Sequence, residues 1–179
     1  MQIQPEYVYP AAALLCGSIA SIFDVKSRRV PNFVTAPGVL IGLLFHLTRD
    51  GWQQMLTALL AGLICGMVFL VFYLAGGMGA GDVKLIVATG CIAGLPNIGY
   101  LLILTALSGG VMAISLATLR GRLKETFLNV GALASHHTQS GLTPHPALNV
   151  LNSNTLRLPY ALAITAGCAL TLCIQVGQR

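Results

Sequence analysis

Five long apolar stretches of this chain contain no Asp, Glu, Lys or Arg, and the longest runs over 35 positions, from residue 85 to residue 119. About 20 apolar residues let a helix cross the hydrocarbon core of a bilayer, so this stretch has room for two crossings. Charged residues make up 8% of the chain, whereas a soluble domain carries about 25%. The pattern excludes an ordinary soluble domain, and also a disordered chain, which needs high charge and low hydrophobicity.

We therefore expect an all-α integral membrane protein, with about six transmembrane helices in a single domain that fills residues 1–179. The turn sequence Gly94-Leu95-Pro96-Asn97 divides the longest stretch into two spans. The first span is expected to be retained rather than cleaved as a leader, because no basic segment precedes it. The expected spans are about 7–23, 33–48, 54–75, 83–95, 98–119 and 159–176.

The basic residues indicate how these spans are oriented. With the N-terminus outside and alternating spans, Arg49 and Arg179 fall outside. The remaining eight of the ten basic residues fall inside: Lys26, Arg28, Arg29, Lys84, Arg120, Arg122, Lys124 and Arg157. An excess of Lys and Arg is typical of cytoplasmic loops, so the net charge of +5 is a marker of topology. Nucleic acid is not an expected partner, because nucleic-acid binding needs a dense basic patch.

Residues 120–158 form the longest segment between expected spans. Leu123, Phe127 and Val130 recur at helical spacing within residues 120–134. This spacing predicts an amphipathic helix on the inner membrane surface. The polar segment 135–154 is expected to be a mobile loop.

Only five acids are present, and two of them have no evident structural duty. Glu6 and Asp50 fall outside, and Glu125 belongs to the surface helix. Asp24 and Asp82 lie where apolar spans meet the inner face. The expected span after Asp82 is only roughly 20 Å long, against about 30 Å of hydrocarbon, which draws Asp82 inward. An ionisable residue at such a depth indicates a functional site.

The surroundings of both acids leave structural interpretations open. Four glycines in residues 76–81 precede Asp82. They allow another chain to approach closely, although small residues also pack membrane helices together. The basic residues after Asp24 could serve only to set the membrane topology, and Asp24 could be a residue that ends a helix without a chemical role.

Two carboxylates on one membrane face suggest aspartic-protease chemistry. Two such groups that share one water cannot both ionise easily, so one keeps its proton and the other acts as base. Neither role is assigned to a particular Asp, because the pair titrates together. A serine triad would need a placed His, and His136, His137 and His145 lie in the polar segment. These histidines could hold a metal weakly, but a solvated loop is the simpler interpretation, and no metal or cofactor is expected.

Three sequence strings resemble motifs of the type IV prepilin peptidases. Gly79-Ala80-Gly81-Asp82-Val83-Lys84-Leu85 resembles their GxGD signature. Asp24, followed by Arg28-Arg29-Val30-Pro31-Asn32, resembles their first motif, and Leu158-Pro159-Tyr160-Ala161 resembles the entry to their last span. The resemblance implies an aspartic endopeptidase of the bacterial inner membrane. Such enzymes remove the basic leader of prepilins or pseudopilins at the cytoplasmic face.

The resemblance also assigns roles to residues of this chain. It implies that Asp24 and Asp82 are catalytic, in contact with a prepilin substrate and surrounded by the bilayer. The positions with supporting roles are Gly79, Gly81, Lys84, Arg28, Arg29, Pro31 and Asn32.

The chain departs from the larger members of that family. They carry an N-terminal segment with paired CxxC motifs and also methylate the new N-terminus with S-adenosylmethionine. The first 23 residues hold no such segment, which argues against methyltransferase activity. The compact form resembles the short peptidases of Flp-type (tight-adherence) pili more than archaeal preflagellin peptidases.

Two other classes of protein remain as alternatives. A small ion-coupled transporter or channel would also place Asp residues and Gly-rich helices in the membrane. It predicts internal repeats, which the sequence does not show, and acids near the midplane. A scaffold of a secretion complex is the third interpretation, and loss of pilin processing in Asp variants would separate the peptidase from both.

Overall fold

The structure is a computed structural model that describes residues 5–27, 29–141, 143 and 159–177. In these residues all regular elements are helical: α1 (Pro5–Ser27), α2 (Asn32–Asp50), α3 (Trp52–Leu74), α4 (Ala80–Ala93), the 3-10 helix η1 (Leu95–Asn97), α5 (Ile98–Leu119), α6 (Leu123–Ser140) and α7 (Tyr160–Gly177). The predictions that concern Arg28, His145, Arg157, Leu158 and Arg179 fall outside the described residues.

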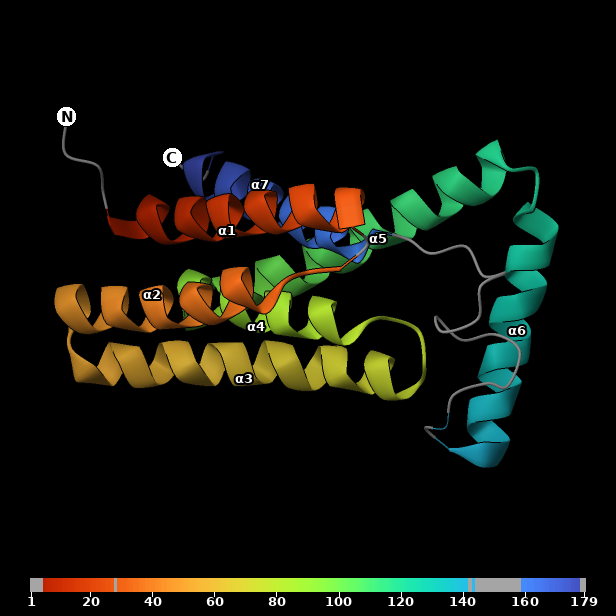
Figure 1. Cartoon of the computed structure of the whole chain (residues 1–179), viewed down its shortest axis with the longest axis horizontal. Helices are drawn as coiled ribbons and strands as arrows, with labels where there is room; N and C mark the ends of the chain where they lie inside the picture. The colour runs from red at the N-terminus through yellow and green to blue at the C-terminus, as the bar shows by residue number, and fades with distance from the viewer. Residues whose placement is uncertain (1–4, 28, 142, 144–158, 178–179) are drawn as a thin grey trace.

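The helices form a bundle that α6 crosses at one end (Figure 1). The end of α1, the start of α4 and the start of α7 lie at the end nearer to α6. We call this the Asp24 end, because Asp24 lies in the last turn but one of α1. The start of α1 and the end of α7 lie at the opposite end, called here the His46 end.

Four helical segments are long and apolar enough to cross a membrane. They are Tyr7–Ser27, Trp52–Leu74, Leu95–Leu119 and Tyr160–Gly177. This confirms the predicted all-α membrane protein. The helices α2 and α4 coincide with the two other expected spans but do not belong to this set, so the count of six crossings stays a prediction.

The short helix α4 occupies the centre of the bundle. It packs against α1, α2, α3 and α7. Its 14 residues extend for roughly 21 Å. Protein rather than lipid surrounds most of α4, which explains why it needs neither the length nor the apolarity of a lipid-exposed span. Its buried residues are Leu85, Ile86, Ala88, Thr89, Gly90, Cys91, Ile92 and Ala93.

Small residues let α3 and α4 approach each other closely. A Cβ atom at Gly62 of α3 would lie 2.2 Å from Cys91 Sγ and 3.0 Å from the Val87 carbonyl oxygen, both on α4. No side chain larger than hydrogen fits there without moving α4, because interiors are close-packed. The position of α4, and of the acid at its start, therefore depends on this contact.

The boundaries near α5 and α6 test two further predictions. The turn in the longest uncharged stretch is confirmed, since η1 follows Gly94, whose φ is 76°. The polar loop was predicted to begin at residue 135, and this start is wrong because α6 continues to Ser140. The hydroxyls of Ser135 and Thr138 donate to carbonyl oxygens three residues earlier, and the helix ends before Gly141, whose φ is 67°.

We predict that Gly62→Ala destabilises the bundle. The added methyl group would overlap Cys91 Sγ, so the free energy of unfolding should fall by about 1–3 kcal/mol. Thermal unfolding in detergent measures this change. Gly110→Ala is the matched control, because nothing lies within 4 Å of a Cβ at Gly110 in α5. An equal loss in both variants would contradict the role of the contact between α3 and α4.

Candidate active site

The two acids singled out in the sequence lie at the same end of the bundle on different helices. Asp24 is close to the end of α1, and Asp82 is in the first turn of α4. Asp24 is buried and Asp82 is partly buried. The two carboxylates are near enough for their charges to interact. The fold thus brings together two groups that are 58 positions apart in the chain.

Backbone amides, rather than basic side chains, contact both carboxylates. The Gly79 amide donates to Asp82 Oδ2 at 3.2 Å. The backbone amide of Ala161, in the first turn of α7, lies beside the carboxylate of Asp24. No basic side chain in the described part of the chain forms an ion pair with either acid. Each acid therefore lies at a helix N-terminus, where the unpaired amides and the helix dipole favour a negative charge.

The start of α4 differs from the expected boundary. The span was predicted to begin at Val83, after Asp82, but α4 begins at Ala80 and includes Asp82. The reason is that the Asp82 carboxylate caps the helix, accepting from Gly79 while the Asp82 amide donates to the Gly79 carbonyl at 3.1 Å. Asp82 thus has a structural role as a cap, which is compatible with a chemical one.

The two acid-containing motifs touch each other through Gly81. A Cβ atom at Gly81 would lie 3.2 Å from Val30 Cβ and 3.4 Å from Val30 N. Val30 belongs to the segment that joins α1 to α2. Because Gly81 has no side chain, this segment can rest on the start of α4 next to Asp82.

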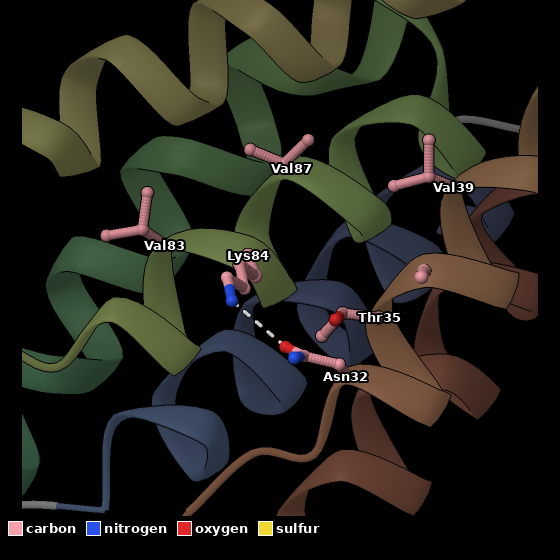
Figure 2. Close-up of a pocket in the computed structure, with 7 residues that line it drawn as sticks. Asn32, Thr35, Val39, Val83, Lys84 and Val87 are labelled. Atoms are coloured by element: carbon pink, nitrogen blue, oxygen red, sulfur yellow. Dashed lines mark hydrogen bonds between the residues drawn. The ribbon is translucent and has the colours of Figure 1, made fainter.

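A second contact between the motifs links Lys84 and Asn32. Lys84 Nζ donates to Asn32 Oδ1 at 3.0 Å, as Figure 2 shows. Both side chains are exposed and border a groove of about 420 Å³, whose other lining residues are Thr35, Ala36, Val39, Val83 and Val87. The groove therefore runs from the turn that follows Asp82 along α2 and α4.

The other predicted supporting residues make backbone contacts or are exposed. Pro31 precedes α2 with extended backbone angles, and its carbonyl accepts from the Val34 amide at 3.1 Å. Gly79 supplies the amide that contacts Asp82. Arg29 is exposed, and Arg28 lies outside the described residues.

Sequence reasoning missed the contribution of α7 to this site. Tyr160, its first residue, packs against the core, and its phenol is within electrostatic range of Asp82. Ala161 contacts Asp24, as described above. The proline before Tyr160 marked the start of the last span. It gave no sign that the first turn would reach both acids.

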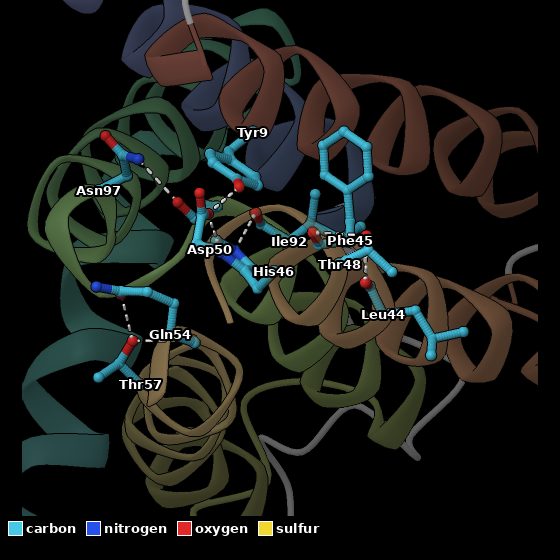
Figure 3. A network of polar contacts seen from close by, with 11 residues as sticks. Tyr9, Leu44, Phe45, His46, Thr48, Asp50, Gln54, Thr57, Ile92 and Asn97 are labelled. Atoms are coloured by element: carbon cyan, nitrogen blue, oxygen red, sulfur yellow. Dashed lines mark hydrogen bonds and ion pairs between the residues drawn. The ribbon is translucent and has the colours of Figure 1, made fainter. Parts of the chain in front are cut away.

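A second polar cluster lies at the His46 end, away from Asp24 and Asp82 (Figure 3). The Tyr9 hydroxyl of α1 donates to Asp50 Oδ2 of α2, and the Tyr9 ring stacks on His46 with centroids 4.1 Å apart. His46 Nε2 donates to the Ile92 carbonyl of α4 at 3.2 Å, and Nδ1 lies 3.6 Å from Asp50 Oδ2. The sequence placed His46 and Asp50 near this end but did not predict that they meet.

This His46 cluster extends to η1 and α7. Gln175 Nε2 donates to Asn97 Oδ1 at 2.8 Å, and Asn97 Nδ2 donates to the Ala93 carbonyl at 2.7 Å. The residues line a cavity of about 620 Å³. Their polar groups satisfy one another, so the cluster ties the ends of α1, α2, α4 and α7 together.

The described residues contain no group of three or more His, Cys, Asp or Glu side chains that could hold a metal ion. Cys173 is exposed, and the other cysteines, Cys16, Cys65, Cys91 and Cys168, are buried free thiols. Among the described residues, the Asp24 end presents two carboxylates, backbone amides and a phenol.

In its described residues the chain is thus a helical membrane protein with two carboxylates within electrostatic range of each other at one end of the bundle. The profile of the type IV leader peptidase family matches residues 11–114, which include both acids, and the chain belongs to this family. The chain is 31% identical over 110 residues to the prepilin leader peptidase/N-methyltransferase of Neisseria gonorrhoeae, and the match covers 57% of this chain and 38% of that protein. No solved structure matches the chain.

We predict that Gly81→Ala lowers peptidase activity. The methyl group would press on Val30 and separate the segment after Asp24 from the start of α4, and a displacement of about 1 Å can lower a rate about 100-fold. Cleavage of a prepilin by the purified chain measures the effect. Gly77→Ala is the control in the same loop, because a Cβ there would meet only the Phe72 carbonyl oxygen, at 3.4 Å. Unchanged cleavage by Gly81→Ala would show that this contact does not matter.

Proposed function

We propose that this chain is a membrane aspartic peptidase that removes the basic leader from prepilins or pseudopilins. The observation that carries the proposal is that Asp24 and Asp82, from two helices of a chain in the leader peptidase family, lie at the same end of the bundle within electrostatic range of each other. No basic partner neutralises either acid among the described residues. The pair is therefore free to exchange protons with a substrate.

The proposed mechanism is direct attack by water, with no acyl-enzyme. One carboxylate takes a proton from the water while the water oxygen forms a bond to the scissile carbonyl carbon. The other carboxyl group donates a proton during collapse of the tetrahedral intermediate, the C–N bond breaks, and the amine leaves in neutral form. After release of both products, the pair again holds one shared proton. Neither role is assigned to Asp24 or Asp82.

The groove beside Asp82 suggests how the substrate approaches. It is lined mainly by small and apolar side chains of α2 and α4 (Figure 2), and its lining includes Val83, the residue after Asp82. In our proposal the apolar part of the prepilin lies along these helices. The extended segment around the scissile bond passes the glycines of residues 76–81 to reach the pair.

The proposed orientation places the Asp24 end at the cytoplasmic face of the bacterial inner membrane. Six exposed basic residues of the described chain lie in segments at this end: Lys26, Arg29, Lys84, Arg120, Arg122 and Lys124. Arg49 is at the His46 end. This distribution follows the excess of basic residues in cytoplasmic loops, and it gives six crossings with α6 on the inner surface.

The proposal concerns peptidase activity and a short Flp-type prepilin as substrate. Both acids lie within residues 11–114, the part matched by the family profile. An archaeal preflagellin is the comparison substrate in the assay.

We predict that Asp24→Asn and Asp82→Asn each abolish cleavage. Loss of either carboxylate removes the base or the acid, and a general acid or base contributes about 100- to 10,000-fold to the rate. Co-expression of each variant with an Flp-type prepilin, followed by detection of the mature pilin, measures this. Glu125→Gln is the control, because Glu125 is an exposed acid on α6. Near-normal cleavage by either Asp variant would overturn the proposed pair.

The orientation predicts opposite labelling of two introduced cysteines. In a Cys173→Ser background, a membrane-impermeant maleimide should label Trp52→Cys in intact cells and Arg122→Cys only after lysis. Both positions are exposed, and they flank opposite ends of the bundle. Cys173 is removed because it is the exposed native thiol among the described residues. Labelling of Arg122→Cys in intact cells, with Trp52→Cys protected, would reverse the topology.

A further inference from the structure

A ring of polar contacts joins α1 to α7 immediately behind Asp24. Ser21 Oγ and Thr165 Oγ1 are 2.7 Å apart. Thr165 Oγ1 donates to the Ala161 carbonyl at 2.8 Å. The backbone amide of Ala161 lies beside the carboxylate of Asp24. Asp24 is three residues after Ser21 on α1, so the path returns to the helix on which it began.

The direction of each bond follows from counting hydrogens. A carbonyl oxygen only accepts, so the single hydroxyl hydrogen of Thr165 is used on Ala161. Ser21 must then donate to Thr165 Oγ1. The carbonyl group of Ala161 is thereby engaged, which fixes the first turn of α7 against α1 at the level of Asp24.

The ring leaves one oxygen of Asp24 without a partner. Asp24 Oδ2 is buried and has no hydrogen-bond partner among the described residues. A buried and unpaired carboxylate oxygen is costly, and a catalytic role is one explanation for such an atom in a native protein. The side chain of Asp24 is 9% exposed, so its direction is set by its protein contacts.

Thr165 can pack this closely against α1 because residue 17 is glycine. A Cβ atom at Gly17 would lie 2.9 Å from Thr165 Oγ1 and 3.4 Å from Thr165 Cα. Gly17, Ser21 and Asp24 follow one another at helical spacing, so one face of α1 meets α7 along this line.

We infer that Ser21 and Thr165 are positioning residues that hold the carboxylate of Asp24 in place for the reaction. This inference rests on the proposed function, because it assumes that Asp24 takes part in the reaction. Neither hydroxyl touches the substrate. Both act through the first turn of α7, whose Ala161 backbone lies beside the carboxylate of Asp24.

The test is the steady-state kinetics of prepilin cleavage by the full chain in detergent. Thr165→Val keeps the shape of the side chain and removes its hydroxyl, so kcat should fall about 10- to 100-fold while KM stays unchanged. Thr165→Ser restores the hydroxyl and should keep kcat within about threefold of the parent. A smaller loss of kcat is expected for Ser21→Ala, which leaves the bond from Thr165 to Ala161 intact.

Thr171→Val is the matched control on the same helix. Thr171 is buried and donates to the Gly167 carbonyl at 2.8 Å, as Thr165 does to Ala161, but it lies far from Asp24 along α7. Its kcat should match that of the parent. An equal loss of kcat in Thr171→Val and Thr165→Val would show a general packing effect and overturn the inference.

Two further results keep the inference separate from the proposed function. If Asp24→Asn remains active, the proposed pair is wrong, whatever Thr165→Val does. If Asp24→Asn is inactive but Thr165→Val has the parent kcat, only the positioning role is overturned. Should Thr165→Val fail to fold, Ser21→Ala alone decides, because unchanged kcat in that variant contradicts the ring.

Discussion

Two backbone amides at helix N-termini determine how this protein can keep two carboxylates in a largely apolar bundle. The Gly79 amide donates to Asp82, and the Ala161 amide lies beside Asp24. An amide stabilises a carboxylate without adding a formal charge, whereas a lysine or arginine partner would form an ion pair. The positions of α4 and α7 follow from this constraint, because the first turn of each must reach its acid. The central burial of α4 then sets the packing of the other helices.

The apolar pattern predicted much of the fold, because membrane helices depend on runs of uncharged residues. The helices α2, α3, α5 and α7 begin and end within two residues of the expected spans. The apolar pattern did not predict the helix boundaries that hydrogen bonds of polar side chains determine. Asp82 belongs to α4 because it caps that helix, and α6 extends to Ser140 because hydroxyl groups bond to its carbonyls. Hydropathy contains no information on such bonds.

The site was predictable as two acids on one face, but not as a set of contacts. Asp24 and Asp82 stood out because acids are scarce, and the fold brings them into electrostatic contact. The parts supplied by Tyr160, Ala161 and Val30 could not be foreseen. They depend on backbone atoms and on helix packing between distant segments, which the spacing of residues along one chain does not specify.

The His46 cluster holds one end of the bundle together. It ties α1, α2, α4 and α7 at the end remote from the acids. Any relative movement of α1 and α4 that keeps these bonds is a rotation about that end. Over the roughly 15 Å of helix between Ile92 and Asp82, a tilt of about 4° moves the carboxylate by about 1 Å. With one end tied in this way, the separation of the two acids is sensitive to small tilts of α4.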